Sequence, residues 1–206
     1  SNGVIVIETK SGSRGDVTYS VNIQRGVNNR AVDGPGTLNA EQWDKLFVDS
    51  YNNATGGALE YGSGASGWDG TTNTDWGNVV RNDNAVQQEY QISAQGGSES
   101  TNFYASTSFF EQEGQTIGSG LERFSGKLNL THRFDDRVTF TNNFNGSFVD
   151  QDGILEGAGY FGSPVLGEYF MLPIDPAYNE DGSPNVNLST TVFHPGYVQE
   201  LDIDRK

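Results

Sequence analysis

Five stretches of this sequence alternate apolar and polar side chains with a period of two, the pattern of β-strands that have one apolar and one polar face. In the fourth stretch, for example, Leu128 and Leu130 alternate with Lys127 and Asn129. A single other stretch has a convincing helical period, so the sequence predicts an all-β fold. The predicted strands cover residues 17–24, 89–95, 102–111, 123–133 and 138–148.

The connections between the predicted strands alternate in length. About 60 residues follow the first strand, a handful the second, about ten the third and about four the fourth, and a long segment begins at Val149. In an antiparallel sheet this places long loops at one end and tight turns at the other, as in outer-membrane β-barrels. The polar faces carry mostly Thr, Asn, Ser and Gln, which suits a water-filled lumen better than the charged face of a soluble sheet. We therefore expect an antiparallel transmembrane β-barrel segment with long extracellular loops. A soluble β-sandwich that binds carbohydrate or acts as an adhesin is the alternative.

Charge and composition exclude several classes of protein. Lys and Arg total 12 against 27 Asp and Glu, a formal charge of −15, which disfavours nucleic acid and anionic membrane surfaces as partners. The sequence has no cysteine, which excludes disulfide frameworks, thiolate metal sites and cysteine nucleophiles. No stretch approaches the roughly 18 to 20 apolar residues of a membrane helix, but a membrane strand needs only about 9 to 11 residues.

Three further segments complete the predicted architecture. Residues 3–7 are apolar and mainly β-branched, as in a strand buried on both faces. Residues 38–52 have apolar side chains at helical spacing, with Asn39 placed as an N-cap, and predict one short helix. Residues 53–84 are too polar to form a core and, with Trp68 and Trp76, too aromatic for a plain linker, so we interpret them as a functional loop.

Five residues are candidates for substrate binding. Trp68, Asp69 and Trp76 lie in the predicted extracellular loop, where flat aromatic rings next to carboxylates and amides are the groups that recognise sugars. The alternative for Trp76 is that it holds the loop on the barrel mouth. Asn143 and Asn145 lie on the polar face of the last predicted strand, where they could line a glycan path or contact a plug inside the barrel.

The sequence predicts no cofactor and no enzymatic activity. Residues 150–153 and 179–182 are similar to calcium-binding loops, but Phe148 and Ala177 occupy the first ligand position of an EF-hand. A looser calcium site built from several loops stays open. His132 and His194 are far apart in the sequence and have no neighbouring Ser and acid that would suggest a catalytic relay.

Four passages of the sequence match, in order, the motifs of one known family. Residues 2–12, NGVIVIETKSG, are similar to a segment NGVIxITTKxG that closes a plug domain. Residues 75–76 and 90–104 correspond to "DW … hNLSVSGGSEKTNYY", and residues 111–114 and 122–130 to "DQEGI … fxRYSxRxNL". Residues 172–182 and 195–205 match a later loop and the approach to a sixth strand. In these passages the chain resembles the SusC/RagA-like family of TonB-dependent outer-membrane receptors. It departs from the motifs at Glu8 and at residues 94–95, and the loop around Trp68 has no counterpart among them.

The resemblance implies a fragment of a larger receptor. Residues 1–13 would be the last strand of the plug domain and its linker, and residues 14–206 the N-terminal part of a barrel of about 22 strands. Loop 1 would cover about 27–86 and loop 3 about 149–200. The resemblance further implies nutrient import across the bacterial outer membrane, of oligosaccharides or peptides, together with a SusD-like surface lipoprotein. Lipid would contact the apolar face, and TonB would bind parts of the receptor outside this chain. The sequence decides neither the substrate nor the oligomeric state.

Overall fold

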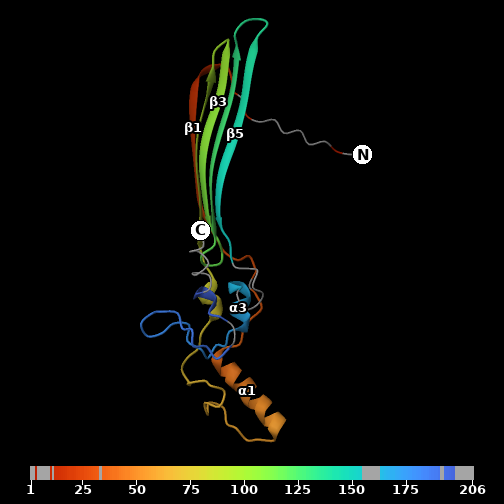
Figure 1. The fold of residues 1–206 in the computed structure, drawn as a ribbon, viewed down its shortest axis with the longest axis vertical. Helices are drawn as coiled ribbons and strands as arrows, with labels where there is room; N and C mark the ends of the chain where they lie inside the picture. The colour runs from red at the N-terminus through yellow and green to blue at the C-terminus, as the bar shows by residue number, and fades with distance from the viewer. Residues whose placement is uncertain are drawn as a thin grey trace. The chain divides into compact units, whose positions relative to one another are not determined.

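The described residues include a five-stranded β-sheet and the helices α1, α2 and α3 (Figure 1). The computed structural model describes residues 3, 10, 12–32, 34–154, 163–190 and 193–197. The strands are β1 (Gly15–Asn28), β2 (Ala85–Gly97), β3 (Thr101–Glu113), β4 (Gly120–Arg133) and β5 (Thr139–Asp152). The helices are α1 (Ala40–Thr55), α2 (Trp76–Val80) and α3 (Pro164–Phe170). The predicted all-β class is confirmed, and α2 and α3 are short helices beyond the predicted one. No helix among the described residues is long and apolar enough to cross a membrane.

Contacts divide the chain into two compact units, which are described separately below. The sheet unit comprises Ser1–Val27, Val86–Glu113 and Gly120–Gln151, and therefore contains the strands. The loop unit comprises Asn28–Ala85, Gly114–Ser119 and Asp152–Lys206, and therefore contains the helices.

The sheet follows the order of the chain, β1-β2-β3-β4-β5, so each strand is hydrogen-bonded to its sequence neighbour. The β2–β3 and β3–β4 pairs are antiparallel. Both short connections are held by local hydrogen bonds: Ser98 N donates to Thr101 O (2.6 Å), and Asp135 Oδ1 accepts from the backbone N of Arg137 and Val138 (2.7 and 2.8 Å). Such side-chain bonds to the backbone are typical of tight turns.

The register aligns the apolar residues of neighbouring strands on one face of the sheet. Tyr90 lies opposite Phe109, which in turn lies opposite Phe124, and Ala105 lies opposite Leu128. Because side chains alternate along a strand, this register also gathers the polar residues on the other face. The alternation seen in the sequence therefore extends over adjacent strands as a continuous face.

The polar face of the sheet carries Lys10, which precedes β1. Asn129 is buried, and its Nδ2 donates a hydrogen bond to the backbone O of Lys10 (2.7 Å). The backbone of Gly12 lies against the backbone of Phe103, so closely that a Cβ atom would have no room there. The predicted strand at residues 4–7 lies outside the described residues.

Helix α1 begins and ends at recognisable capping residues. Asn39 Oδ1 accepts from Gln42 N (2.8 Å) and Gln42 Oε1 accepts from Asn39 N (3.0 Å), which completes a capping box. Gly56 ends the helix in the left-handed conformation (φ 67°), which glycine adopts without steric cost. The predicted helix and its predicted N-cap are therefore confirmed, with the end three residues later than expected.

Candidate functional site

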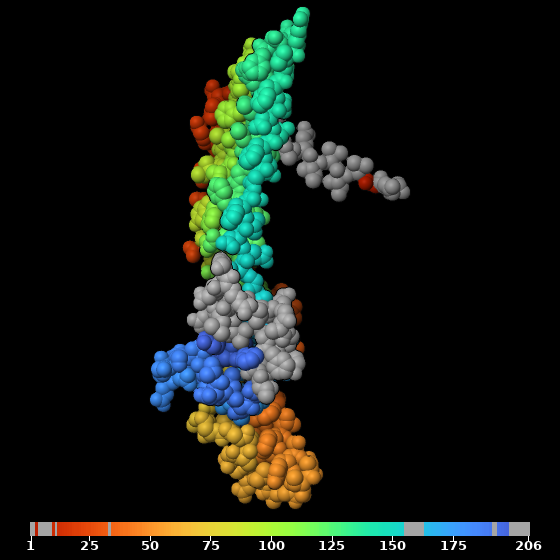
Figure 2. All heavy atoms as spheres, in the orientation of Figure 1, coloured from red at the N-terminus to blue at the C-terminus, as the bar shows by residue number. Residues whose placement is uncertain are grey.

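The loop unit is built from the three connections that are not tight turns. Loop 1 joins β1 to β2, loop 2 (residues 114–119) joins β3 to β4, and loop 3 follows β5. Ile117 N donates to Val80 O (2.9 Å), and Gln115 Nε2 donates to Asn29 O (3.0 Å), so loop 2 is bonded to loop 1. Thr74 N donates to Pro173 O (2.8 Å), which bonds loop 1 to loop 3. The atoms of loops 1 and 3, orange to yellow and blue in Figure 2, lie against one another.

Trp76 lies in the small apolar core of this unit. Its side chain is 3% exposed, packs with Met171 and Ala177, and donates a hydrogen bond from Nε1 to Leu172 O (2.8 Å). Its ring also meets the ring of His194 edge-on, with 5.3 Å between the centroids. The ring therefore has no free face for a ligand. The geometry favours the anchoring interpretation, with the modification that Trp76 holds loop 1 to loop 3.

Trp68 and Asp69 close a local turn at the surface of loop 1. Trp68 is half-buried, and its Nε1 donates to Thr72 O (2.7 Å). Asp69 accepts from the Thr72 hydroxyl (2.6 Å) and from the backbone N of Thr72 and Thr71 (2.7 and 2.8 Å). These bonds, that of the Thr72 hydroxyl first, hold the pKa of Asp69 well below its usual range. A role of either residue in substrate binding stays a prediction.

Asn143 and Asn145 belong to the sheet unit. Both are exposed on β5, and the strand alternation places them on the opposite face from Phe144. The structure does not assemble them with Trp68, Asp69 and Trp76, which belong to the loop unit. Their predicted contact with substrate stays a prediction.

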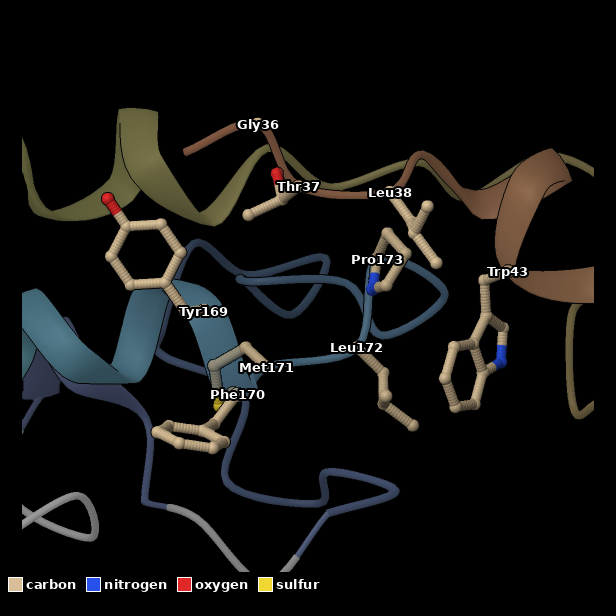
Figure 3. Close-up of a pocket in the computed structure, with 9 residues that line it drawn as sticks. All are labelled: Gly36, Thr37, Leu38, Trp43, Tyr169, Phe170, Met171, Leu172 and Pro173. Carbon is tan, nitrogen blue, oxygen red and sulfur yellow. The ribbon is translucent and has the colours of Figure 1, made fainter. Parts of the chain in front are cut away.

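A pocket of about 260 Å³ lies between loop 1 and loop 3 (Figure 3). Trp43 of α1 lines one end and Tyr169 of α3 lines the other, with Leu38 and Pro173 between them. The complete lining is Gly36, Thr37, Leu38, Trp43, Tyr169, Phe170, Met171, Leu172 and Pro173. Sequence reasoning missed this site, although the aromatic and apolar run at residues 169–174 was a signal that could have drawn attention to it.

A buried ion-pair cluster joins the two ends of loop 1 to α3. The side chain of Glu168 is fully buried, and its Oε1 lies 3.1 Å from Arg81 Nη2 and 3.6 Å from Arg30 Nη1. The hydrogen bond that Arg81 donates to Glu168 raises the pKa of Arg81, and the nearby carboxylate of Glu168 also raises the pKa of Tyr169. The two guanidinium groups therefore pair with a carboxylate that is shielded from water.

No group of three or more Asp, Glu or His side chains in the described part of the chain is arranged to hold a metal ion. In one of the two calcium-like segments, Asp181 Oδ1 instead accepts from the backbone N and the hydroxyl of Ser183 (2.9 and 2.6 Å). These bonds lower the pKa of Asp181. A calcium site that draws on further loops stays a prediction.

Comparison with known proteins finds receptors of one kind. No protein-family model matches the chain. TonB-dependent receptor P26 of Formosa agariphila is 26% identical over 186 residues, which cover 90% of this chain and 18% of that receptor. TonB-dependent receptor SusC of Bacteroides thetaiotaomicron is 28% identical over 209 residues, which cover 96% of this chain and 19% of SusC. The chain therefore spans about a fifth of the length of these relatives.

Solved structures give the same fold. A structure of the RagAB peptide importer in the closed-closed state matches 92% of this chain and 25% of its own chain, with a TM-score of 0.65 and 21% identity. A structure of the same importer in the open-open state matches 93% of this chain with a TM-score of 0.60 and 20% identity.

Proposed function

Since this chain is a segment of a SusC/RagA-like TonB-dependent receptor of the bacterial outer membrane, we propose that it forms the first strands and first outer loops of a nutrient importer. The proposed cargo is an oligosaccharide or a peptide, and the proposed partners are TonB, a SusD-like surface lipoprotein and outer-membrane lipid. Within the importer the chain has an architectural role, because its strands build part of the wall and its loops shape the mouth. We assign no catalytic step to it.

The exposed apolar face of the sheet is the observation that supports this proposal. Leu128 is 39% exposed, Phe140 49% and Phe144 59%, although a soluble β-sandwich would bury such side chains against a second sheet. The described residues form a single sheet. A contiguous apolar face of this kind indicates contact with lipid or with a protein partner.

The length of the strands fits the same proposal. Strands β2 to β5 have 13 or 14 residues each. At roughly 3.4 Å per residue they extend about 45 Å, which exceeds the roughly 30 Å of a bilayer core. Each strand is therefore long enough to cross the membrane even when tilted.

We further propose that residues 1–13 are the end of the plug domain and its linker, and that residues 14–206 begin the barrel. The bond from Asn129 to the backbone of Lys10 supports this division, because it holds Lys10 on the polar face of the sheet. In a membrane barrel the polar face borders the lumen, where a plug lies.

Uptake by cells tests the proposed function. The full-length gene would be deleted and restored in its host, and the uptake of fluorescent peptides and oligosaccharides would be measured with and without functional TonB. We expect at least one cargo class to require both the gene and TonB, and the protein to fractionate with the outer membrane. Recovery of the full-length protein in a soluble fraction, or uptake that ignores TonB, would overturn the proposal.

A further inference from the structure

We propose that the pocket between loop 1 and loop 3 binds one apolar side chain of a cationic peptide. This inference rests on the proposed function and narrows its cargo from two chemical classes to one. It is carried by the chemistry of the lining, by the size of the pocket and by the charge of the loop unit.

The lining is suited to an apolar group. Among the nine lining residues, the polar side-chain groups are the hydroxyls of Thr37 and Tyr169 and the indole N–H of Trp43. The hydroxyl of Tyr169 already interacts with the carboxylate of Glu168, which raises the pKa of this phenol. None of the nine residues carries the carboxylate, amide or cationic group with which proteins hold the hydroxyls of a sugar. The aromatic and aliphatic groups that remain gain free energy by removing an apolar ligand from water.

The size of the pocket limits the ligand to about one side chain. Its volume of about 260 Å³ lies below the roughly 300 to 1,000 Å³ of pockets that enclose a drug-sized molecule. Two of its apolar side chains are open to solvent in this structure, Leu38 at 44% and Phe170 at 49% exposure. A side chain that enters from the solvent side would therefore cover apolar surface of the rim as well as of the interior.

The negative charge of the loop unit favours a cationic peptide as the ligand that bears this side chain. The loop unit contains seventeen acidic and five basic residues, a net charge of −12, whereas the sheet unit contains ten acidic and seven basic residues, a net charge of −3. Two of the five basic residues, Arg30 and Arg81, are paired with Glu168. A field of this sign raises the local concentration of cationic ligands and lowers that of anionic ones.

Matched peptides test the inference on the purified full-length receptor with its lipoprotein partner. The probes are three tripeptides with blocked termini, Lys-Phe-Lys, Lys-Ala-Lys and Glu-Phe-Glu, and their dissociation constants would be measured by fluorescence anisotropy at low salt. We expect Lys-Phe-Lys to bind at least tenfold more tightly than either of the other two. Trp43→Ala should weaken Lys-Phe-Lys about tenfold and leave Lys-Ala-Lys nearly unchanged. Leu46→Ala, an exposed position of α1 outside the lining, should change neither.

The inference depends on whether Trp43→Ala weakens the phenylalanine peptide more than the alanine peptide. If Trp43→Ala weakens the binding of both lysine peptides equally, or of neither, the pocket does not bind the phenylalanine side chain. This would be the result if another part of the receptor filled the pocket. Displacement of Lys-Phe-Lys by the neutral oligosaccharide maltohexaose through the same Trp43-dependent site would also overturn the inference. Failure of the proposed function would give another result. Trp43→Ala would then still weaken Lys-Phe-Lys selectively, but cells would show no TonB-dependent uptake.

Discussion

His194 is the residue whose charge state the loop unit constrains most directly. Its side chain is 2% exposed and lies against the rings of Trp76 and Tyr178. Because Ala177 O can only accept a hydrogen bond, Nε2 carries the proton of this 2.8 Å bond. Because Tyr197 N can only donate, Nδ1 is the unprotonated acceptor at 3.1 Å. The neutral ring satisfies both contacts, and a second proton on Nδ1 would break one of them.

This geometry predicts that the loop unit loosens in acid. Burial lowers the pKa of His194, against a smaller opposing effect of the bond to Ala177. The loosened state therefore takes up the proton more readily than the folded one, so the stability present above about pH 6.5 is lost as the pH falls further. The groups facing the ring are the phenol of Tyr178 and the indole of Trp76, neither of which carries a charge at this pH. Hydrogen exchange of the loop unit in the full-length receptor between pH 7.5 and 5 should show the loss of protection.

Substitution separates His194 from other acid-sensitive groups. His194→Gln should remove the dependence of hydrogen-exchange protection on pH in this range, even if the variant has lower protection at every pH. His132→Gln should keep the change, because His132 lies on β4 and its Nδ1 is bonded to the hydroxyl of Thr101 (2.7 Å) in the sheet unit. A pH response that persists unchanged in His194→Gln would refute this role.

At the residue scale, the sequence predicted only the roles that depend on residues nearby in the sequence. Asn39 was identified as an N-cap because a cap acts on backbone groups within three residues. Trp76 stayed undecided between binding and anchoring, since its partner Leu172 is 96 residues away. Glu168 was not singled out, because its partner Arg81 is 87 residues away and no local pattern joins them.

At the scale of elements, the strands were predictable and the short helices were not. The alternation of side chains located all five strands and their faces, because β-strand periodicity is visible within a few residues. The end of β4 at Arg133 was predicted correctly, but the other ends were placed too early. For example, β2 continues to Gly97 and β5 to Asp152, because backbone hydrogen bonding extends beyond the apolar alternation. Helices α2 and α3 have five and seven residues, too few to show a helical period. Ser163 and Pro164, which cap and begin α3, were the available signal.

The two faces of β5 should respond differently to a charge. Phe144→Arg places a guanidinium on the exposed apolar face, where near the bilayer midplane it should cost about 2 to 4 kcal/mol of folding free energy in the membrane. Thr141→Arg, on the polar face of the same strand, should be tolerated. The measurement is the yield of heat-modifiable, folded full-length receptor in the outer membrane. Equal yields of the two variants would contradict the assignment of the apolar face to lipid.

At the scale of the whole chain, the three long connections behave as one body with its own core and its own charge. Trp76 with Met171 and Ala177 forms the apolar centre of this body, and hydrogen bonds join loop 1 to both loop 2 and loop 3. The length alternation in the sequence predicted that long and short connections would separate. It could not predict that the long ones fold together, because the contacts that join them are distant in the sequence.

The buried Glu168 is expected to stabilise this body by fixing both ends of loop 1 to α3. Glu168→Ala would leave Arg30 and Arg81 without their carboxylate, and removing one member of a buried pair costs roughly 3 to 5 kcal/mol. Since the arginine side chains are 25% and 28% exposed, part of their hydration is retained. We therefore expect Glu168→Ala to lower the free energy of unfolding of the loop unit by about 3 kcal/mol, near the lower end of this range. Native-state hydrogen exchange of residues 76–81 and 163–171 in the full-length receptor measures it.

The same experiment distinguishes a buried pair from general surface charge. Glu168→Gln, which keeps an acceptor for Arg81 but loses the charge, should destabilise less than Glu168→Ala. Glu60→Ala removes an exposed carboxylate of loop 1 and should change protection little, because exposed charges contribute about 0 to 1 kcal/mol. Protection in the sheet unit should be unaffected by all three variants, since Glu168 and both arginines lie in the loop unit. If Glu60→Ala and Glu168→Ala lower protection equally, the cluster does not join the loops, and their association rests on the apolar core around Trp76.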